Sequence, residues 1–267
     1  MPALDRWDAF LAQIKSRHEQ VRAEAQAEGR QFIAGVAGGG DYLPLSYQLS
    51  AVKNRLLDLE QKVMETWHAQ VDDAILNEGN PVPVRDAACQ KGIDLQHALE
   101  DARDEAEIGL MAELARARYQ AAMATLQPVQ CPRCLMTFQP PHSFRLIEWA
   151  CQCGGVLRYD PSELMRSAGT IGTHPISQEA AVNEWRAMVA ADRRAKDARS
   201  PCPLSLLQAY EAAQIAYWRR YLATRAWFEP ELGRDPDMEV RKRMEQWYVY
   251  SAEHEEAWRA AGRPRAI

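Results

Sequence analysis

Four of the six cysteines in the 267-residue chain fall close together, as Cys131, Cys134, Cys151 and Cys153. They form a C-x-x-C pair and a C-x-C pair, separated by sixteen residues. Structural zinc binds four ligands tetrahedrally, and two cysteine pairs on tight turns supply such a set. A chain of this length can build a hydrophobic core without disulfides. The cluster therefore predicts a metal site, with structural zinc as the expected ion.

The residues around the cysteines favour short strands and tight turns. Pro140 and Pro141 mark the end of a hairpin, and Gly154 and Gly155 let the backbone fold around the second cysteine pair. We expect short strands over residues 136–138, 144–149 and 156–159. With these motifs, residues 127–160 resemble a zinc ribbon, a rubredoxin-like pair of cysteine knuckles. Leu135 stands where the usual knuckle has glycine, and the second pair is C-x-C in place of C-x-x-C.

The resemblance implies that the four cysteines hold one ion, and four such ligands leave no open coordination position. We therefore expect a structural metal and not a catalytic one. His142 is the alternative fourth ligand, and iron is the alternative metal. A redox role for Cys131 and Cys134 would need a βαβ context that the sequence does not suggest. Cys89 and Cys202 lie far away and are expected to be buried or half-buried thiols.

Two further patterns could ligate metal. Glu65 and His68, and likewise Asp94 and His97, are three residues apart and would share a helix face, as ligands do in di-iron bundles. Such bundles need further carboxylates on two other helices, so we expect solvated or capping histidines. The glycine-rich stretch 35–40 is not followed by Lys-Ser or Lys-Thr and is expected to be a hinge. No catalytic constellation is recognised, so a non-enzyme is predicted.

Composition limits the class of protein. The apolar share is 47% and the charged share 26%, as in ordinary globular chains. The net charge is -5, with -7 over residues 1–126 and +2 over residues 127–267. Neither part is strongly basic, as a general nucleic-acid binder would be. No apolar run approaches the length of a membrane span, and the start does not resemble a cleaved signal. We expect a cytoplasmic protein, with export that needs no cleaved signal left open.

Outside the ribbon, apolar residues recur at spacings of three and four, which is typical of helices packed on one another, as in coiled coils. A loop is expected through Pro175, with Ser177 as the N-cap of the helix that follows. The predicted helices cover residues 4–32, 46–77, 84–126, 162–168, 177–199, 204–228 and 237–261. The predicted fold is mainly α, with long antiparallel helical hairpins forming a bundle and a small inserted β zinc ribbon. The expected regions are 1–126, 127–160 and 161–267.

The absence of a catalytic constellation favours a non-enzymatic helical interaction, scaffold or adaptor protein that binds a protein partner or a second copy of itself. Two alternatives stay open. The first is a nucleic-acid-binding adaptor, and the second is an enzyme with an unrecognised site in the helical core. The adaptor would use basic and aromatic ribbon side chains for phosphate contacts and stacking. These are Arg133, Arg145, Arg158, Phe138, Phe144, Trp149 and Tyr159.

Overall fold

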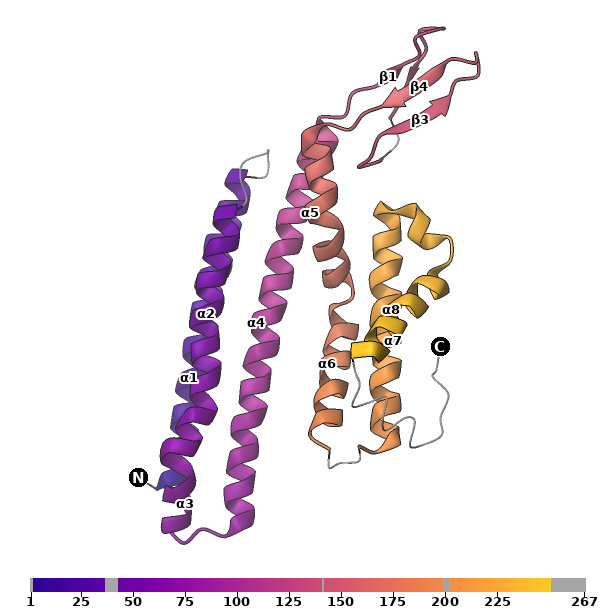
Figure 1. The fold of residues 1–267 in the computed structure, drawn as a ribbon. Helices are drawn as coiled ribbons and strands as arrows, with labels where there is room; N and C mark the ends of the chain where they lie inside the picture. The colour runs from indigo at the N-terminus through magenta and orange to yellow at the C-terminus, as the bar shows by residue number, and fades with distance from the viewer. Residues whose placement is uncertain (1, 37–42, 141, 199–201, 251–267) are drawn as a thin grey trace. The chain divides into compact units, whose positions relative to one another are not determined.

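The computed structural model describes residues 2–36, 43–140, 142–198 and 202–250. The protein is mainly α-helical, as predicted, with two small antiparallel sheets of two strands each (Figure 1). Its helices are α1 (Ala3–Val36), α2 (Leu43–Thr66), the π-helical turn η1 (Trp67–Val71), α3 (Asp72–Asn77), α4 (Val82–Ala124), α5 (Glu163–Ala180), α6 (Val182–Lys196), α7 (Leu204–Phe228), the 3-10 turn η2 (Pro230–Gly233) and α8 (Pro236–Tyr250). Among the described helices, none has a stretch long and apolar enough to cross a bilayer.

The chain forms two compact units, residues 1–110 and 111–267, and the boundary falls within α4. The three regions expected from the sequence stay a prediction. Of the glycine-rich stretch 35–40, the first two residues end α1 and the others lie outside the described part of the chain.

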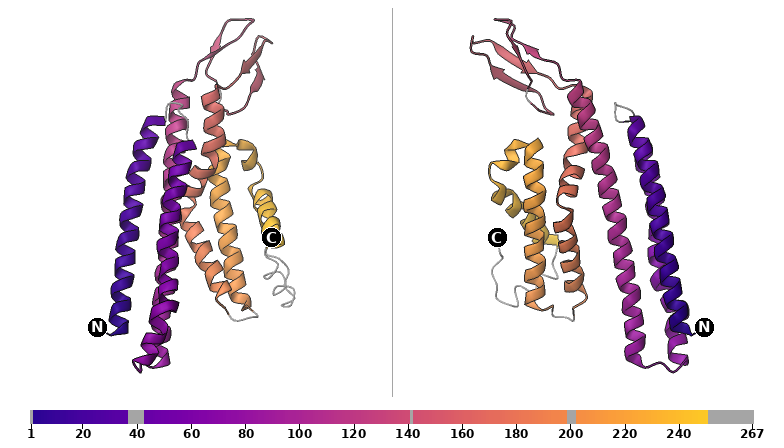
Figure 2. Two further views of the ribbon diagram at one scale, coloured as in Figure 1. Left: turned by 60° about the vertical axis from the view of Figure 1, so that its left-hand side comes forward. Right: turned by 180° about the vertical axis from the view of Figure 1, so that it is seen from behind.

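The first unit is a set of helices that alternate in direction. The Ala3 amide donates to the Glu78 carboxylate at 2.9 Å, which sets the start of α1 beside the end of α3. α1 and α2 therefore run antiparallel and lie side by side (Figures 1 and 2). Lys53 of α2 donates to Glu107 of α4 at 2.9 Å. The helical rod from α2 through α3 confirms the helix predicted up to Asn77.

Two tryptophans centre the core of this unit. Trp7 and Trp67 are 1% and 2% exposed, with ring centroids 5.4 Å apart. The Trp7 indole N–H donates to the Ala88 carbonyl at 2.9 Å, so its polar atom is satisfied inside the core. Gly92 of α4 admits the Trp7 ring, because a Cβ there would lie only 2.7 Å from it. This close approach explains a glycine inside a long helix.

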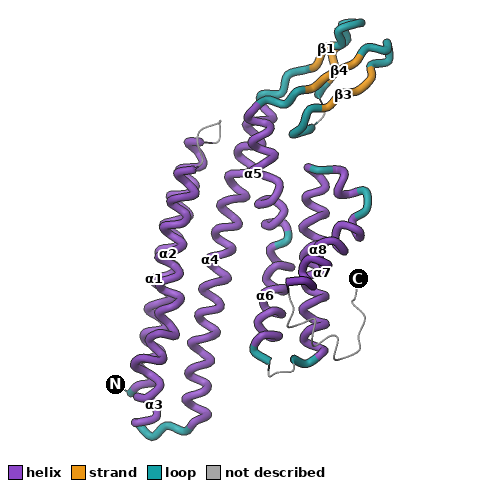
Figure 3. The backbone as a smooth tube through the Cα atoms, in the orientation of Figure 1, coloured by secondary structure: helices purple, strands orange, loops and turns teal. Residues whose placement is uncertain are grey.

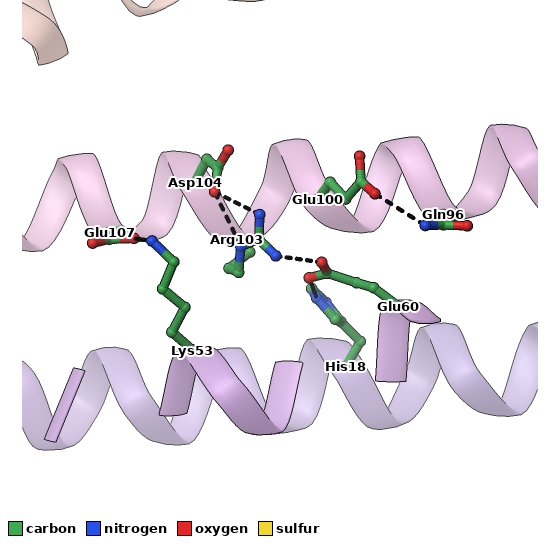
Figure 4. A network of polar contacts seen from close by, with 8 residues as sticks. All are labelled: His18, Lys53, Glu60, Gln96, Glu100, Arg103, Asp104 and Glu107. Atoms are coloured by element: carbon green, nitrogen blue, oxygen red, sulfur yellow. Dashed lines mark hydrogen bonds and ion pairs between the residues drawn. The ribbon is translucent and has the colours of Figure 1, made fainter. Parts of the chain in front are cut away.

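A buried polar group joins three helices of the same unit (Figure 4). His18 of α1 contacts Glu60 of α2, and the second carboxylate oxygen of Glu60 accepts from Arg103 of α4. Arg103 also donates to Asp104 at 3.0 Å. His18 stands in the apolar stripe of α1, and its pairing with Glu60 satisfies the Nε2 atom of the buried ring, while Nδ1 has no hydrogen-bond partner among the described residues.

In the second unit, the helix predicted over residues 162–168 is present, but the expectation for residues 169–177 is wrong. A loop was expected through Pro175 and an N-cap at Ser177, but α5 is one helix over Glu163–Ala180 (Figure 3). Ser162 is its N-cap and accepts from the Met165 amide at 3.2 Å. Inside the helix, Ser177 donates to the Thr173 carbonyl at 2.6 Å.

Tertiary packing explains the difference. Met165 and Ala168 are buried against Ala122 of α4, and Gly172 lies against Ala115 of the same helix. This buried face keeps residues 163–180 helical although Pro175 lacks the N–H that an interior helical position normally donates. The helix break falls at Ala181 instead.

α7 lies among α5, α6 and α8 and contacts each of them (Figures 1 and 2). Its bounds match the prediction. Tyr248 of α8 donates to Glu211 of α7, and Arg219 pairs with Asp237, so α7 and α8 run antiparallel. The predicted continuation of the last helix beyond Tyr250 lies outside the described residues. The core here combines aliphatic side chains with the buried aromatic residues Tyr217, Tyr221 and Tyr248.

Candidate metal centre

The cysteine-rich segment between α4 and α5 is built from two short hairpins. β1 (Val129–Gln130) pairs antiparallel with β2 (Thr137–Phe138), and β3 (Ile147–Ala150) pairs antiparallel with β4 (Val156–Tyr159). β2 and β4 lie within predicted ranges, β3 covers the end of the range 144–149 and extends to Ala150, and β1 was not predicted. Each hairpin has one cysteine pair at its turn. The strands therefore bring together two pairs that are distant in sequence.

The four sulfur atoms form one compact group, all within 4.8 Å of one another. Cys131 Sγ lies 3.6 Å from Cys153 Sγ, and Cys134 Sγ lies 3.7 Å from Cys151 Sγ. Four thiolates at about 2.3 Å around a tetrahedral zinc ion would be roughly 3.8 Å apart. A disulfide would need about 2.05 Å, and all four thiols are free. The residues therefore fit a four-coordinate metal.

The first knuckle is a tight turn closed by backbone hydrogen bonds. The Leu135 amide donates to the Cys131 carbonyl at 2.9 Å, and the Cys131 amide donates to the Met136 carbonyl at 2.9 Å. Leu135 has a φ of 61°, in the left-handed region that favours glycine. Leu135, which stands where the usual knuckle has glycine, therefore occupies the strained backbone position of this turn.

Two glycines shape the second knuckle. Gly154 has a φ of 77°, and its amide donates to the Cys151 carbonyl at 2.9 Å. A Cβ on Gly155 would lie 2.8 Å from Cys131 Sγ, so only glycine lets the backbone approach the sulfur group this closely. The shortened C-x-C spacing is accommodated by this sharp turn, and Cys153 reaches the other three sulfurs.

The thiols of the cluster do not ionise equally. Backbone amides of Cys134 and Arg133 point at the Cys131 sulfur and lower the pKa of that thiol to about 6. For Cys153, the amide of Gly155 favours the thiolate, but burial and the neighbouring sulfurs outweigh it and raise the pKa to about 12. Several thiolates this close together repel one another, so a bound cation is needed to keep all four deprotonated.

The remaining candidate ligands lie elsewhere. His142 follows β2 and lines an aromatic hollow with Tyr119 and Phe144, apart from the sulfur group. Within the described part of the chain, the four cysteines are the one group of three or more His, Cys, Asp or Glu residues close enough to share an ion. The pairs formed by Glu65 with His68 and by Asp94 with His97 join no such group.

The two distant cysteines match their prediction. Cys89 and Cys202 are half-buried free thiols. Burial raises the pKa of each, which keeps both thiols protonated and poorly reactive near neutral pH.

Most ribbon residues proposed for nucleic-acid contacts are engaged within the ribbon. Arg133 donates to the Cys153 carbonyl at 2.8 Å, and Arg158 pairs across the strands with Glu148 at 3.9 Å. Trp149 packs with the cysteines in the ribbon's small core, and Tyr159 is 6% exposed. Few of these side chains therefore present a free stacking face.

Phe144 connects the ribbon to the helices of its own unit. Its ring lies directly over Gly169 of α5, where a Cβ would come within 2.3 Å of the ring. The same ring has its centroid 6.0 Å from those of Tyr119 in α4 and Phe228 in α7. The sequence did not indicate this contact, because a glycine that admits an aromatic ring has the same appearance in sequence as a glycine that breaks a helix.

No protein-family model, curated protein or solved structure matches this chain.

Proposed function

We propose that Cys131, Cys134, Cys151 and Cys153 hold one structural zinc ion, in a non-enzymatic helical interaction protein that serves as a scaffold or adaptor. The observation that supports the metal site is the closed group of four sulfurs within 4.8 Å of one another. Four thiolates complete a tetrahedral shell and leave no position for a substrate. Zinc is proposed over iron because zinc is the usual ion of closed four-cysteine ribbons.

The role of the metal in this proposal is to order the ribbon. Its buried apolar group is little more than Leu157 with the cysteines, with Val129, Phe138 and Trp149 around them. So small a core does not fold alone, whereas structural zinc supplies an apparent ~10–16 kcal/mol in small modules. An ordered ribbon holds the segment that bears Phe144 against Gly169. Zinc thus acts as a joint between strands and helices.

Exposed apolar side chains support the interaction role. Of the nine large apolar side chains that are exposed among the described residues, four lie on the ribbon. These are Leu135, Met136, Leu146 and Val156. Leu135 and Met136 are neighbours in the chain, and exposed apolar side chains that lie together are typical of binding surfaces. The expected partner is another protein or a second copy of the chain, and the cytoplasmic location stays a prediction.

The test combines metal analysis with association measurements on the full chain. We expect one zinc per chain in the wild type, much less in Cys131→Ser and Cys153→Ser, and an unchanged content in Cys89→Ser. Light scattering and affinity capture from the native host should then show a dimer or a specific partner. A zinc-loaded chain that is monomeric and captures nothing would contradict the interaction role. If metal analysis found iron in place of zinc, only the identity of the metal would change in this proposal.

A further inference from the structure

The second unit contains a hollow walled by aromatic rings. It encloses about 240 Å³. Its walls come from α4, α5, α7 and the segment that follows β2. The lining residues are Tyr119, Met123, His142, Phe144, Met165, Trp227 and Phe228.

The rings of this aromatic hollow hold one another in place. The Tyr119 centroid lies 5.8 Å from both Trp227 and Phe228, in edge-to-face arrangements. Phe144 stacks with Phe228 at 6.0 Å. Trp227 is nevertheless 64% exposed. A large aromatic side chain left in solvent beside an aromatic hollow is typical of a recognition site, because covering it would bury much apolar area.

A second hollow of about 350 Å³ shares Phe144 as a wall. Its lining includes three cations, Arg145, Arg166 and Arg225, and one anion, Glu229. Arg225 donates to Glu229 at 2.9 Å, and Arg166 pairs with Asp160. Arg225 also donates to the Tyr221 hydroxyl at 3.3 Å. A guanidinium has five N–H donors, so an arginine that already has partners can still donate to a further carboxylate. This arginine hollow is therefore complementary to an acidic group.

We propose that the two hollows together bind a segment of a partner protein that carries a large aromatic side chain beside acidic residues. The aromatic side chain enters the aromatic hollow, and a neighbouring carboxylate pairs with the arginine hollow. The proposal rests on the proposed interaction function and names the chemistry of its partner. It assigns Trp227 and Arg145 to binding, one from each hollow.

A protein segment fits these charges better than a nucleic acid does. Residues 111–267 carry 21 Lys or Arg against 18 Asp or Glu, a net charge of +3. A strand of nucleic acid needs a continuous basic track along its phosphates. On the ribbon, the acidic Glu148 lies 3.9 Å from Arg158 and interrupts such a track. One arginine hollow beside one aromatic hollow instead matches an acidic residue next to an anchor side chain.

The test measures binding of a fluorescein-labelled peptide, Gly-Glu-Glu-Ala-Trp-Glu-Glu-Gly, to the zinc-loaded full chain by fluorescence anisotropy. Two control peptides replace the tryptophan by alanine or all glutamates by glutamine. We expect Trp227→Ala and Arg145→Ala to weaken binding by about tenfold or more. The matched controls Met238→Ala and Arg219→Ala change exposed residues outside both hollows and should shift the Kd by less than about twofold.

Three results would overturn the proposal. The first is no binding of the acidic peptide at concentrations up to ~1 mM. The second is equal binding by wild type and Trp227→Ala. The third is tighter binding of labelled oligo-dT that Trp227→Ala abolishes, which would assign the hollows to nucleic acid. Affinity capture from the native host distinguishes a failure of this binding site from a failure of the proposed interaction function. If wild type and Trp227→Ala recover the same partner equally, the hollows are not its site, while the interaction function stands.

Discussion

His18 Nε2 lies 3.1 Å from Glu60 Oε1, and both side chains are only 1% exposed. Glu60 also accepts from Arg103, which is 11% exposed, so one carboxylate joins α1, α2 and α4 (Figure 4). Buried polar groups can form hydrogen bonds with one another in only one register of their helices. Apolar side chains can still pack together when one helix shifts along another. We infer that Glu60 fixes the register of the three helices in the first unit.

Removal of the Glu60 carboxylate should be costly, because the buried His18 loses its carboxylate partner and the largely buried Arg103 is left with Asp104. We expect Glu60→Ala to lower the free energy of unfolding of the first unit by about 3–5 kcal/mol. The matched control is Glu107→Ala, since Glu107 pairs with Lys53 and both side chains are more than 40% exposed. That change should cost about 0–1 kcal/mol. Urea denaturation followed by circular dichroism measures the unfolding free energy of both variants. Similar losses in the two would refute the register role of Glu60.

Two glycine substitutions test how the ribbon is held on the helices. In Gly169→Ala, the new Cβ would meet the Phe144 ring at 2.3 Å, and the ring must move. We expect a loss of about 1–3 kcal/mol in unfolding free energy, as for other overpacked sites. Gly109→Ala is the control, because no atom lies within 4 Å of its added Cβ. In an open helical position that change should stabilise by roughly 0.5–1 kcal/mol. Thermal melts measure both changes. If both variants were stabilised, or both destabilised, the result would contradict the Phe144 contact.

The sequence predicted those parts of the structure that local spacing determines. The clustering of Cys131 with Cys153 is predictable because two close cysteine pairs are a recognisable sequence pattern. α7 was bounded correctly because apolar periodicity and Pro203 are also local signals. The loop predicted through Pro175 is wrong, because the packing of α5 keeps this segment helical although proline is a local helix breaker. The sequence also could not pair His18 with Glu60, since their contact spans 42 positions.

Leu135 offers a test of the first knuckle, since it has a left-handed φ of 61° and is 65% exposed. Glycine adopts this conformation without the cost of about 1–2 kcal/mol that a side chain incurs. Leu135→Gly should therefore leave the knuckle as stable or stabilise it by up to about 1 kcal/mol. The adjacent Met136 is also exposed and lacks a positive φ, so Met136→Gly should destabilise it. Competition with a zinc chelator measures the zinc affinity of both variants. Weaker zinc binding by Leu135→Gly would contradict backbone strain at Leu135.

Removal of the metal should unfold the ribbon before the helices. The thiols of Cys134 and Cys153 have raised pKa values when no ion is present, so they return to the protonated state. We expect chelation to broaden the amide resonances of residues 129–159, while the helices of the first unit keep their hydrogen-exchange protection. Zinc should restore the ribbon with release of protons. Equal loss of protection in α1 would show instead that the metal stabilises the whole chain.

Alkaline pH should weaken the second unit through Tyr217 of α7. Burial, with a smaller effect of Tyr221, raises the pKa of the Tyr217 hydroxyl from 10.0 to about 12. Between these values the unfolded state has lost the proton that the folded state retains, so the unfolding free energy falls as pH rises. One such group contributes a slope of at most about 1.4 kcal/mol per pH unit. Urea melts at pH 9, about 10 and about 11 should show a steeper decline in wild type than in Tyr217→Phe. Parallel declines would mean that another group carries the alkaline sensitivity, and the Tyr217 assignment would then be wrong.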